Sequence, residues 1–247
     1  MFLSRVEVSA AAGDRESFWR DLSRPYGAHQ ALWALLARSP DQKRDFLFHA
    51  EEGREAPSFL VLSAQCPKAA EESPWRVDSK PFAPVLRAGQ RLAFRLRASP
   101  VVRRGEAVDG KANRRVHRHD VVMDLAKRLE ARGEIAPDVA ALIRDAGVDW
   151  LSKQAGRSGF RLVKAETEVI GDDGLLDEAG EAQAAIRVEG YRQHRISRRG
   201  ESPIRFSTLD FEGVLEVTEP VTLLDKVTRG FGPQKAFGCG LMLLRRV

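Results

Sequence analysis

The stretch Arg91-Leu92-Ala93-Phe94-Arg95-Leu96-Arg97-Ala98 decides the fold of this chain. Its apolar side chains at alternate positions form one face suited to a core, and arginines at three of the other positions form a cationic face. Antiparallel sheets with one face open to solvent or to a polyanion have this pattern. The stretch therefore predicts an antiparallel strand with one buried and one cationic face.

Segments before and after this strand repeat one order of elements. In the first part we expect a strand, a helix and two hairpin strands, at residues 2–8, 23–38, 45–50 and 58–65. After the Arg91 strand we expect two helices, three strands, a helix and a last strand, at residues 121–132, 137–154, 160–167, 191–196, 205–217, 220–229 and 241–247. Residues 101–120 read as a basic loop, residues 171–185 as an acidic mobile loop, and Gly213 as a bulge.

Strand-helix-strand-strand in each part is the ferredoxin-like plan. We therefore predict an α+β fold of two tandem ferredoxin-like (RRM-like) βαββαβ domains with antiparallel sheets. The predicted domains span residues 1–87 and 88–247, and the first lacks a recognisable second helix.

Composition indicates a basic globular protein. The chain has 247 residues, a formal charge of +5 and a pI near 9.5, which favours polyanionic partners. Arginine pairs bidentately with phosphate, although arginines also solubilise a surface. The two cysteines, Cys66 and Cys239, give neither a disulfide framework nor a zinc cluster. Without a membrane-length apolar stretch or a signal-peptide pattern, we expect a cytoplasmic protein with no membrane partner.

The glycine-rich stretch Gly230 to Gly240 contains four glycines within eleven residues. Such a loop exposes amide groups, allows positive φ and lets the backbone approach a ligand, while Lys235 adds positive charge. A helix is expected before the loop and a strand after it, which is the reverse of a P-loop or a dinucleotide-binding loop. We therefore predict no nucleotide cofactor, and phosphate contacts from Lys235, Gly232, Gly238 and Gly240. The alternative is a helix C-cap with a tight turn, which explains one or two glycines.

Tyr26 and His29 lie one helical turn apart in Tyr26-Gly27-Ala28-His29-Gln30-Ala31-Leu32-Trp33. An imidazole with a pKa near 6.5 exchanges protons near neutrality, and a phenol orients a hydroxyl or a phosphate oxygen. The pair suits RNA cleavage in which a 2′-hydroxyl attacks the adjacent phosphorus without a metal. The competing interpretation is a histidine that packs beside Trp33.

Other basic residues are weaker candidates. His117 and His119 lie in a basic segment without a cysteine or carboxylate cluster, so phosphate contact is a simpler interpretation than a metal site. Residues 193–199 predict a basic hairpin tip that enters an RNA groove, or else a charged strand edge that blocks aggregation. The remaining RNA-binding candidates and the weaker histidine candidates are Arg157, Arg195, Arg198, Arg199, His49 and His194.

Several blocks along the chain, taken together, resemble the CasE family of CRISPR precursor-RNA endoribonucleases. They occur in family order over nearly the whole length, and the ordered set is far more specific than any one block. The blocks are Phe2-Leu3-Ser4-Arg5-Val6, Tyr26 to Trp33, Arg44-Asp45-Phe46-Leu47-Phe48, Phe94-Arg95-Leu96-Arg97-Ala98-Ser99-Pro100, Asp210-Phe211-Glu212-Gly213 and Gly230 to Gly240.

The resemblance implies metal-independent cleavage at the base of the CRISPR repeat stem-loop, without a cofactor. Products would carry a 2′,3′-cyclic or 3′-phosphate and a 5′-hydroxyl, and the enzyme would stay bound as a subunit of the type I-E Cascade complex, beside its backbone subunit. The family histidine corresponds to His29, the accompanying tyrosine to Tyr26, and the glycine-rich loop to Gly230 to Gly240.

Two other classes of function compete with this one. A non-catalytic RNA-binding subunit would share the fold and keep RNA affinity after loss of His29. A metal-dependent nuclease needs clustered carboxylates, which the sequence does not present.

Overall fold

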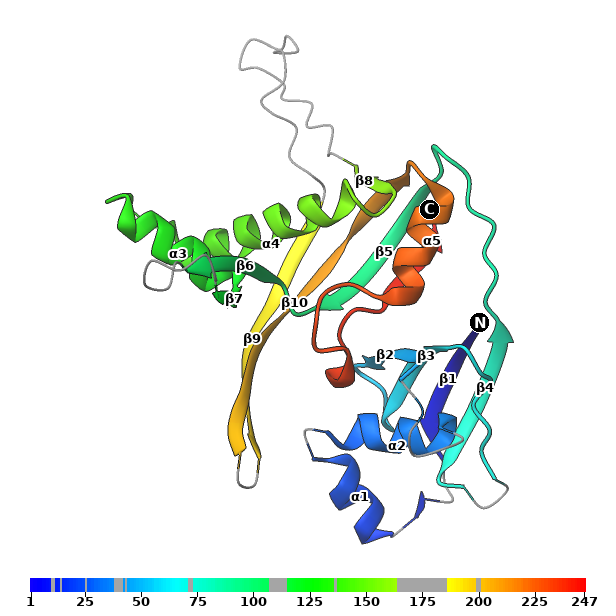
Figure 1. Ribbon diagram of the computed structural model, residues 1–247. Coiled ribbons are helices and arrows are strands. Elements are labelled where there is room, and N and C mark those ends of the chain that lie inside the picture. The colour runs from blue at the N-terminus through cyan, green and yellow to red at the C-terminus, as the bar shows by residue number, and fades with distance from the viewer. Residues whose placement is uncertain are drawn as a thin grey trace, which may run out of the picture.

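The structure is a computed structural model in which residues 1–9, 12–13, 15–24, 26–37, 42, 44–70, 73–106, 115–135, 137–163, 186–198 and 201–247 are described. Two antiparallel sheets lie one above the other, and a two-stranded hairpin stands apart from both (Figure 1). The α+β class and the antiparallel sheets expected from the sequence are confirmed.

The first sheet has the strand order β2-β3-β1-β4, which is the order of a ferredoxin-like domain, and all three pairings are antiparallel. Its elements are β1 (Phe2–Val8), α1 (Glu16–Leu22), α2 (Gly27–Leu36), β2 (Phe46–Glu51), β3 (Ser58–Ser63) and β4 (Trp75–Pro81). As expected, the described residues between β3 and β4 contain no helix.

Two elements of this first unit were not expected from the sequence. The helix α1 precedes α2, which begins only at Gly27 rather than near residue 23. The strand β4 pairs with β1 alone at the edge of the sheet, where a proline is tolerated and few apolar side chains are needed. Its polar, proline-containing sequence therefore looked like a connecting segment.

The second sheet has the order β11-β5-β10-β8, and β9 pairs with the other part of β10. Its elements and the adjoining hairpin are β5 (Arg91–Ala98), β6 (Val101–Glu106), β7 (Arg115–Asp120), α3 (Val121–Ala131), α4 (Val139–Ala155), β8 (Phe160–Leu162), β9 (Ile186–Arg198), β10 (Glu201–Val217), α5 (Pro220–Arg229), η2 (Lys235–Phe237) and β11 (Met242–Arg246). Counting β8 and β9 as one interrupted strand, this is again the ferredoxin-like order.

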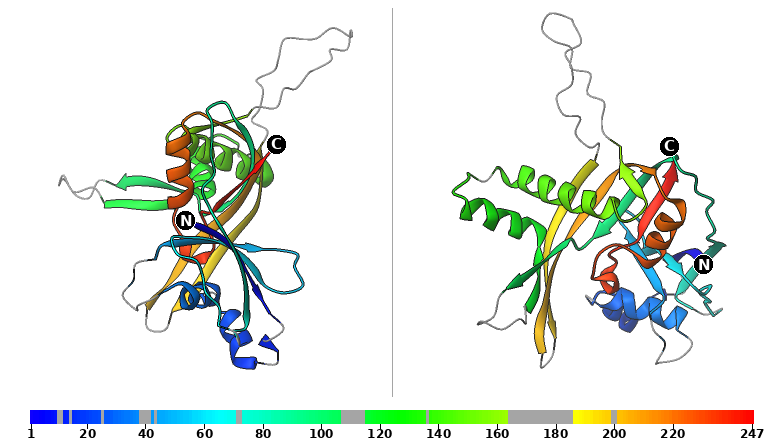
Figure 2. Two further views of the ribbon diagram at one scale, coloured as in Figure 1. Left: turned by 90° about the vertical axis from the view of Figure 1, so that its right-hand side faces the viewer. Right: turned by 45° about the horizontal axis from the view of Figure 1, so that its top comes forward.

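The strand predicted from Arg91 to Ala98 is confirmed with the same bounds. Its apolar side chains Leu92, Phe94, Leu96 and Ala98 are all buried in the core of the second unit. The helices α4 and α5 cover one face of this sheet (Figure 2) and contribute Trp150, Leu151, Leu223 and Val227 to the same core.

Two predictions in this half are wrong. Residues 101–106 and 115–120 are not loop but pair as the hairpin β6–β7, whose many arginines hid the strand pattern. Gly213 is in regular register with Phe94, and one of two irregularities in the β9–β10 pairing lies where Gly190 and Tyr191 of β9 face Leu209 of β10. Gly190 has φ +67°, which suits a bulge that starts with a left-handed glycine. The predicted mobile loop at residues 171–185 lies outside the described residues.

The two units share a core. Leu47 and Leu62, on the face of the first sheet opposite α2, pack into the apolar cluster of the second unit. Residues 82–90 connect β4 to β5, and Phe82 and Leu86 pack against that cluster. The division into domains after residue 87 stays a prediction. No helix within the described ranges is both long and apolar enough to span a membrane.

Candidate active site

The helix α2 carries the predicted pair and starts unusually close to α1. A Cβ atom on Gly27 would lie 2.0 Å from the carbonyl oxygen of Asp21 and 2.7 Å from that of Leu22. Only glycine permits this approach, because the contact lies far inside van der Waals distance. The close crossing fixes the start of α2, and with it the direction in which Tyr26 and His29 project.

The structure brings Tyr26 and His29 together. Their rings meet edge-on with centroids 4.7 Å apart. Tyr26 is 39% exposed, whereas His29 is only 8% exposed. The phenol is therefore more accessible to a ligand than the imidazole beside it.

His29 lies in an aromatic pocket. Its ring stacks on Phe46 at 5.5 Å and contacts Trp33 at 5.9 Å, and its buried Nδ1 atom has no hydrogen-bond partner among the described residues. Burial and, secondarily, the positive charge of Arg44 lower the pKa of His29 to about 4. The imidazole is consequently neutral at pH 7 and able to accept a proton.

Two cations stand near the pair. Arg44 lies two residues before Phe46, the first residue of β2, and its charge acts on His29 and Tyr26. Lys235 donates a hydrogen bond to the carbonyl oxygen of Arg229, and burial together with the charge of Arg44 lowers the pKa of its ammonium group. The charges on Arg44 and Lys235 are suited to a phosphate that approaches Tyr26.

An aromatic row links the pair to β10 of the second sheet. Phe237 of η2 contacts Tyr26 with ring centroids 5.4 Å apart and Phe206 of β10 at 4.9 Å. Phe206 stacks on His194 at 4.6 Å, and His194 hydrogen-bonds Thr208 at 3.0 Å. The long hairpin β9–β10 thus reaches the start of α2 through η2.

The glycine-rich loop owes its glycines to backbone geometry and packing. Gly230, Gly232, Gly238 and Gly240 all have positive φ, between 69° and 96°. Added Cβ atoms would approach Leu47, Ser99, Phe48 and Phe231, respectively, rather than open space. The N–H of Gly240 already donates to the carbonyl oxygen of Arg97 at 2.7 Å, so it is not free to bind a phosphate. For Gly232 and Gly238, contact with RNA stays a prediction.

An ion-pair cluster joins the two units near this loop. Arg97 of β5 binds both carboxylate oxygens of Asp210 at 2.7 Å and also Glu52 of the first unit at 2.8 Å. These contacts raise the pKa of Arg97. A Cβ atom on Gly190 would lie 2.7 Å from Asp210, so the bulge glycine makes room for this carboxylate.

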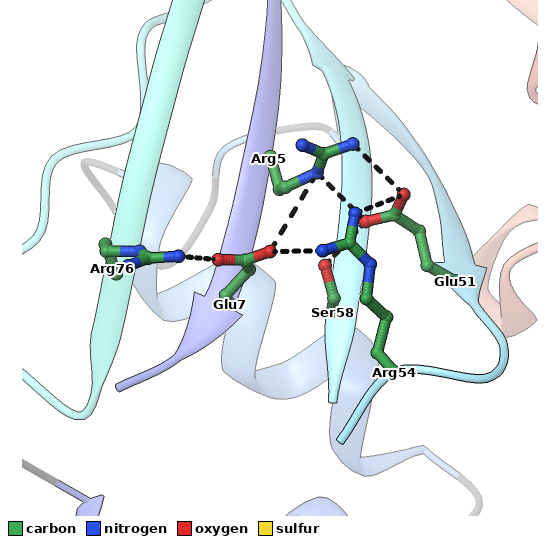
Figure 3. Close-up of polar contacts among 6 residues, drawn as sticks. All are labelled: Arg5, Glu7, Glu51, Arg54, Ser58 and Arg76. Carbon is green, nitrogen blue, oxygen red and sulfur yellow. Dashed lines mark hydrogen bonds and ion pairs between the residues drawn. The ribbon is translucent and has the colours of Figure 1, made fainter. Parts of the chain in front are cut away.

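A second charged network, on the first sheet, is internally satisfied (Figure 3). Glu51 binds Arg5 at 3.1 Å and Ser58 at 2.6 Å, while Glu7 binds Arg54 at 3.4 Å and also Arg76. Because its arginines are committed to carboxylates, this face offers few free cations to an anion.

The other predicted RNA contacts lie apart from the pair. Arg195 is exposed on β9 directly opposite Arg205 of β10, and Arg157 lies just after α4. Arg198 ends β9, but its side chain and the whole of Arg199 lie outside the described residues.

Sequence reasoning missed the roles of Arg44, Phe46, Phe206 and Phe237 beside the pair. Arg44 and Phe46 stand in one of the blocks that carry the family resemblance, which was the available signal. Nothing local indicates that Phe206 and Phe237 lie near Tyr26. Among the residues that the structure describes, no three His, Cys, Asp or Glu side chains gather as a group that could hold a metal ion.

The fold and this site define a tandem ferredoxin-like protein with a tyrosine–histidine pair beside a glycine-rich loop. Residues 1–246 match the family described as CRISPR associated protein, and the chain belongs to that family. The CasE family expected from the sequence blocks is thereby confirmed.

Named relatives match this chain over nearly its full length. The chain is 32% identical to "CRISPR system Cascade subunit CasE" of Escherichia coli, with 99% of this chain and 98% of that protein covered. It is 31% identical to "CRISPR-associated endoribonuclease Cse3" of Thermus thermophilus, with 98% of each covered. The solved structure of CRISPR endoribonuclease Cse3 bound to 19 nt RNA matches with a TM-score of 0.65 at 28% identity, covering 99% of both chains.

Proposed function

We propose that this chain is an endoribonuclease that cleaves repeat stem-loops in precursor CRISPR RNA and remains on the product as a Cascade subunit in the cytoplasm. The family membership and the relatives named endoribonuclease Cse3 and Cascade subunit CasE support the substrate and the assembly. The single observation that carries the catalytic part is a neutral imidazole, His29, in ring contact with the exposed phenol of Tyr26.

The proposed reaction is an internal transesterification. The 2′-oxygen forms a bond to the adjacent phosphorus as the bond from phosphorus to the 5′-oxygen breaks. The 2′-hydroxyl proton passes to a base, and the leaving 5′-oxygen takes up a proton. The products carry a 2′,3′-cyclic phosphate and a 5′-hydroxyl, and the step is proposed to need no metal.

His29 is assigned the proton transfers as base, acid or both, and Tyr26 orients the 2′-hydroxyl or a phosphate oxygen. Proton transfer by a positioned side chain contributes about 10²–10⁴-fold to a rate. Arg44 and Lys235 supply positive charge where negative charge develops on the phosphate oxygens.

A second candidate is a non-catalytic RNA-binding subunit. The observation in its favour is the burial of His29 against Phe46 and Trp33, which also suits a packing role. Contacts in RNA-free enzymes often become productive only in the substrate complex, so this burial does not decide between the two candidates.

The test is incubation of the purified protein with a labelled repeat stem-loop in excess EDTA, followed by analysis of the product ends. We expect cleavage, with a cyclic phosphate and a 5′-hydroxyl. A 5′-phosphate on the product contradicts internal attack, and loss of cleavage in EDTA contradicts the metal-free step.

His29→Ala separates the two candidates. We expect a cleavage rate 10²–10⁴-fold lower with stem-loop affinity unchanged. The control is Gln30→Ala, which removes an exposed side chain from the same helix. Unchanged cleavage in His29→Ala removes His29 from the mechanism.

A further inference from the structure

A large cavity lies outside the candidate active site. It is a cleft of about 960 Å³ between α3, α4, the hairpin β6–β7 and the start of the glycine-rich loop. Ten of its lining residues are charged: Arg103, Arg104, Arg118, Asp124, Arg128, Asp145, Asp149, Lys153, Arg157 and Lys226. Nothing in the proposed chemistry uses this cleft.

The carboxylates of the cleft are already paired. Asp124 binds Arg104 at 2.6 Å and Arg128 at 3.1 Å, and Asp149 binds Lys153 at 2.6 Å. Asp145 pairs with Arg144, which lies outside the cleft.

The cleft contains more cations than its carboxylates pair with. Arg103, Arg118, Arg157 and Lys226 have no ion pair among the described residues. The cleft therefore presents four positive charges that its own acids do not neutralise.

The hairpin β6–β7 gives the clearest sign of an anion site. Arg103 and Arg118 are direct cross-strand partners, and both line the cleft. Like charges directly opposite each other destabilise an antiparallel pair. An anion between the two guanidinium groups removes that repulsion and uses their planar, bidentate donors.

The cleft is joined to the candidate active site by one short segment. Gly232 and Pro233 line the cleft, and Phe237 of the same loop contacts Tyr26. Pro233 and Phe237 are four residues apart, so their Cα atoms are separated by at most about 14 Å. A nucleic-acid strand that passes Tyr26 thus has the cleft within reach.

We propose that this cleft binds the phosphodiester backbone of the unpaired RNA strand adjoining the stem-loop. Several spaced cations, rather than one pocket for a single phosphate, fit an extended polyanion. This inference rests on the proposed function only for the identity of the RNA, because the geometry of the cleft does not involve His29.

The test measures binding rather than cleavage. The RNAs are a repeat stem-loop with a 2′-deoxy group at the scissile position, alone and with an unpaired extension at either end. They are titrated against the unsubstituted protein, R103Q/R118Q and the control R245Q/R246Q. The control removes the same charge from exposed arginines of β11 that do not line the cleft.

We expect an extension to raise affinity and steepen the salt dependence for the unsubstituted protein and for the control. R103Q/R118Q should lose this gain while binding the bare stem-loop normally. Its slope of log K against log salt should fall by about 0.7 for each lost phosphate contact. Circular dichroism and melting confirm that the variants fold. Because the readout is binding and the cleft does not include His29, failure of the proposed catalysis leaves this readout intact.

The proposal is overturned if neither extension raises affinity. It is also overturned if R103Q/R118Q weakens binding of the bare stem-loop as much as binding of the extended RNA, since the cleft then binds the stem. Binding of a polyglutamate peptide that R103Q/R118Q abolishes, without any effect of the extensions, would assign the cleft to an acidic protein segment instead.

Discussion

Tyr26 brings two chemical groups to the candidate site, an aromatic ring and a hydroxyl. The ring packs edge-on against His29 and Phe237, whereas the hydroxyl is the group assigned to the substrate. Tyr26→Phe keeps the ring contacts and removes the hydroxyl, and Tyr26→Ala removes both.

We expect Tyr26→Phe to lower the single-turnover cleavage rate about 10–100-fold, because a hydrogen bond to a charged group contributes roughly 1.5–3 kcal/mol. Tyr26→Ala should lower it further, since His29 then loses a packing partner. Cleavage by Tyr26→Phe at the unsubstituted rate would show that the hydroxyl takes no part.

His29 also predicts a pH dependence. If its neutral form is the base, kcat/KM should rise with pH up to about 4 and level off above it, rather than titrate near 6.5. Rates at pH 3.5–8 with a matched folding control test this. In the RNA complex, nearby phosphates favour the imidazolium ion, so the limb in kcat should lie at higher pH. A kcat/KM limb near 6.5 would contradict a desolvated base.

The pKa of His29 differs between the folded and the unfolded chain, and this difference makes stability depend on pH. The unfolded chain binds more protons than the folded chain between pH 4 and 6.5, because burial lowers the pKa of His29 in the folded state. The His29 contribution to stability therefore rises with pH through this window.

At the scale of the element, the glycine-rich loop is a structural connection as well as a candidate phosphate contact. Gly240→Ala places a Cβ atom 2.6 Å from the carbonyl oxygen of Phe231 at a residue with φ +96°. Gly53→Ala is the matched control, because Gly53 has φ +76° and no atom within 4 Å of the added Cβ.

Both substitutions cost about 1–2 kcal/mol for the left-handed backbone, and Gly240→Ala adds about 1–3 kcal/mol for overpacking. Urea unfolding should therefore show the larger loss for Gly240→Ala. Equal losses would mean that the loop shifts freely and does not depend on this close contact.

At the scale of the whole molecule, Arg97 joins the two units through Glu52, while it also pairs with Asp210 of its own unit. Its carbonyl oxygen also accepts from Gly240, which anchors the loop that carries Phe237 to Tyr26. Arg97→Gln keeps this backbone contact but removes the ion pairs with Glu52 and Asp210, so it should disturb the arrangement of the units in addition to their stability.

For Arg97→Gln we expect the free energy of unfolding to fall by about 1–3 kcal/mol, which is less than for a fully buried ion pair because Arg97 is 19% exposed. We also expect the cleavage rate to fall more than the RNA affinity. Arg95→Gln is the control, since Arg95 lies on the same strand, is 60% exposed and pairs with Glu212 of its own unit. A similar effect from both substitutions would contradict a role for Arg97 between the units.

Local sequence predicted most elements, because helices and strands each space their apolar residues with a characteristic period. Alternation identified β5 with its final bounds, and apolar spacing with Pro220 at the first turn identified α5. The edge strand β4 and the hairpin β6–β7 were not predicted, because edge and solvent-facing strands need few apolar side chains to pair. The proximity of Tyr26 and His29 also followed from sequence, since one helical turn separates them.

The chain's sequence by itself determined its family, its two repeated units and the helix that carries the pair. Only the tertiary structure decided that His29 is buried against Phe46, that Phe237 reaches Tyr26, and that Arg103 lies opposite Arg118 in the hairpin β6–β7. Helix and strand periods are set by neighbouring residues, whereas burial, pKa and the pairing of charges depend on side chains brought together from distant parts of the chain.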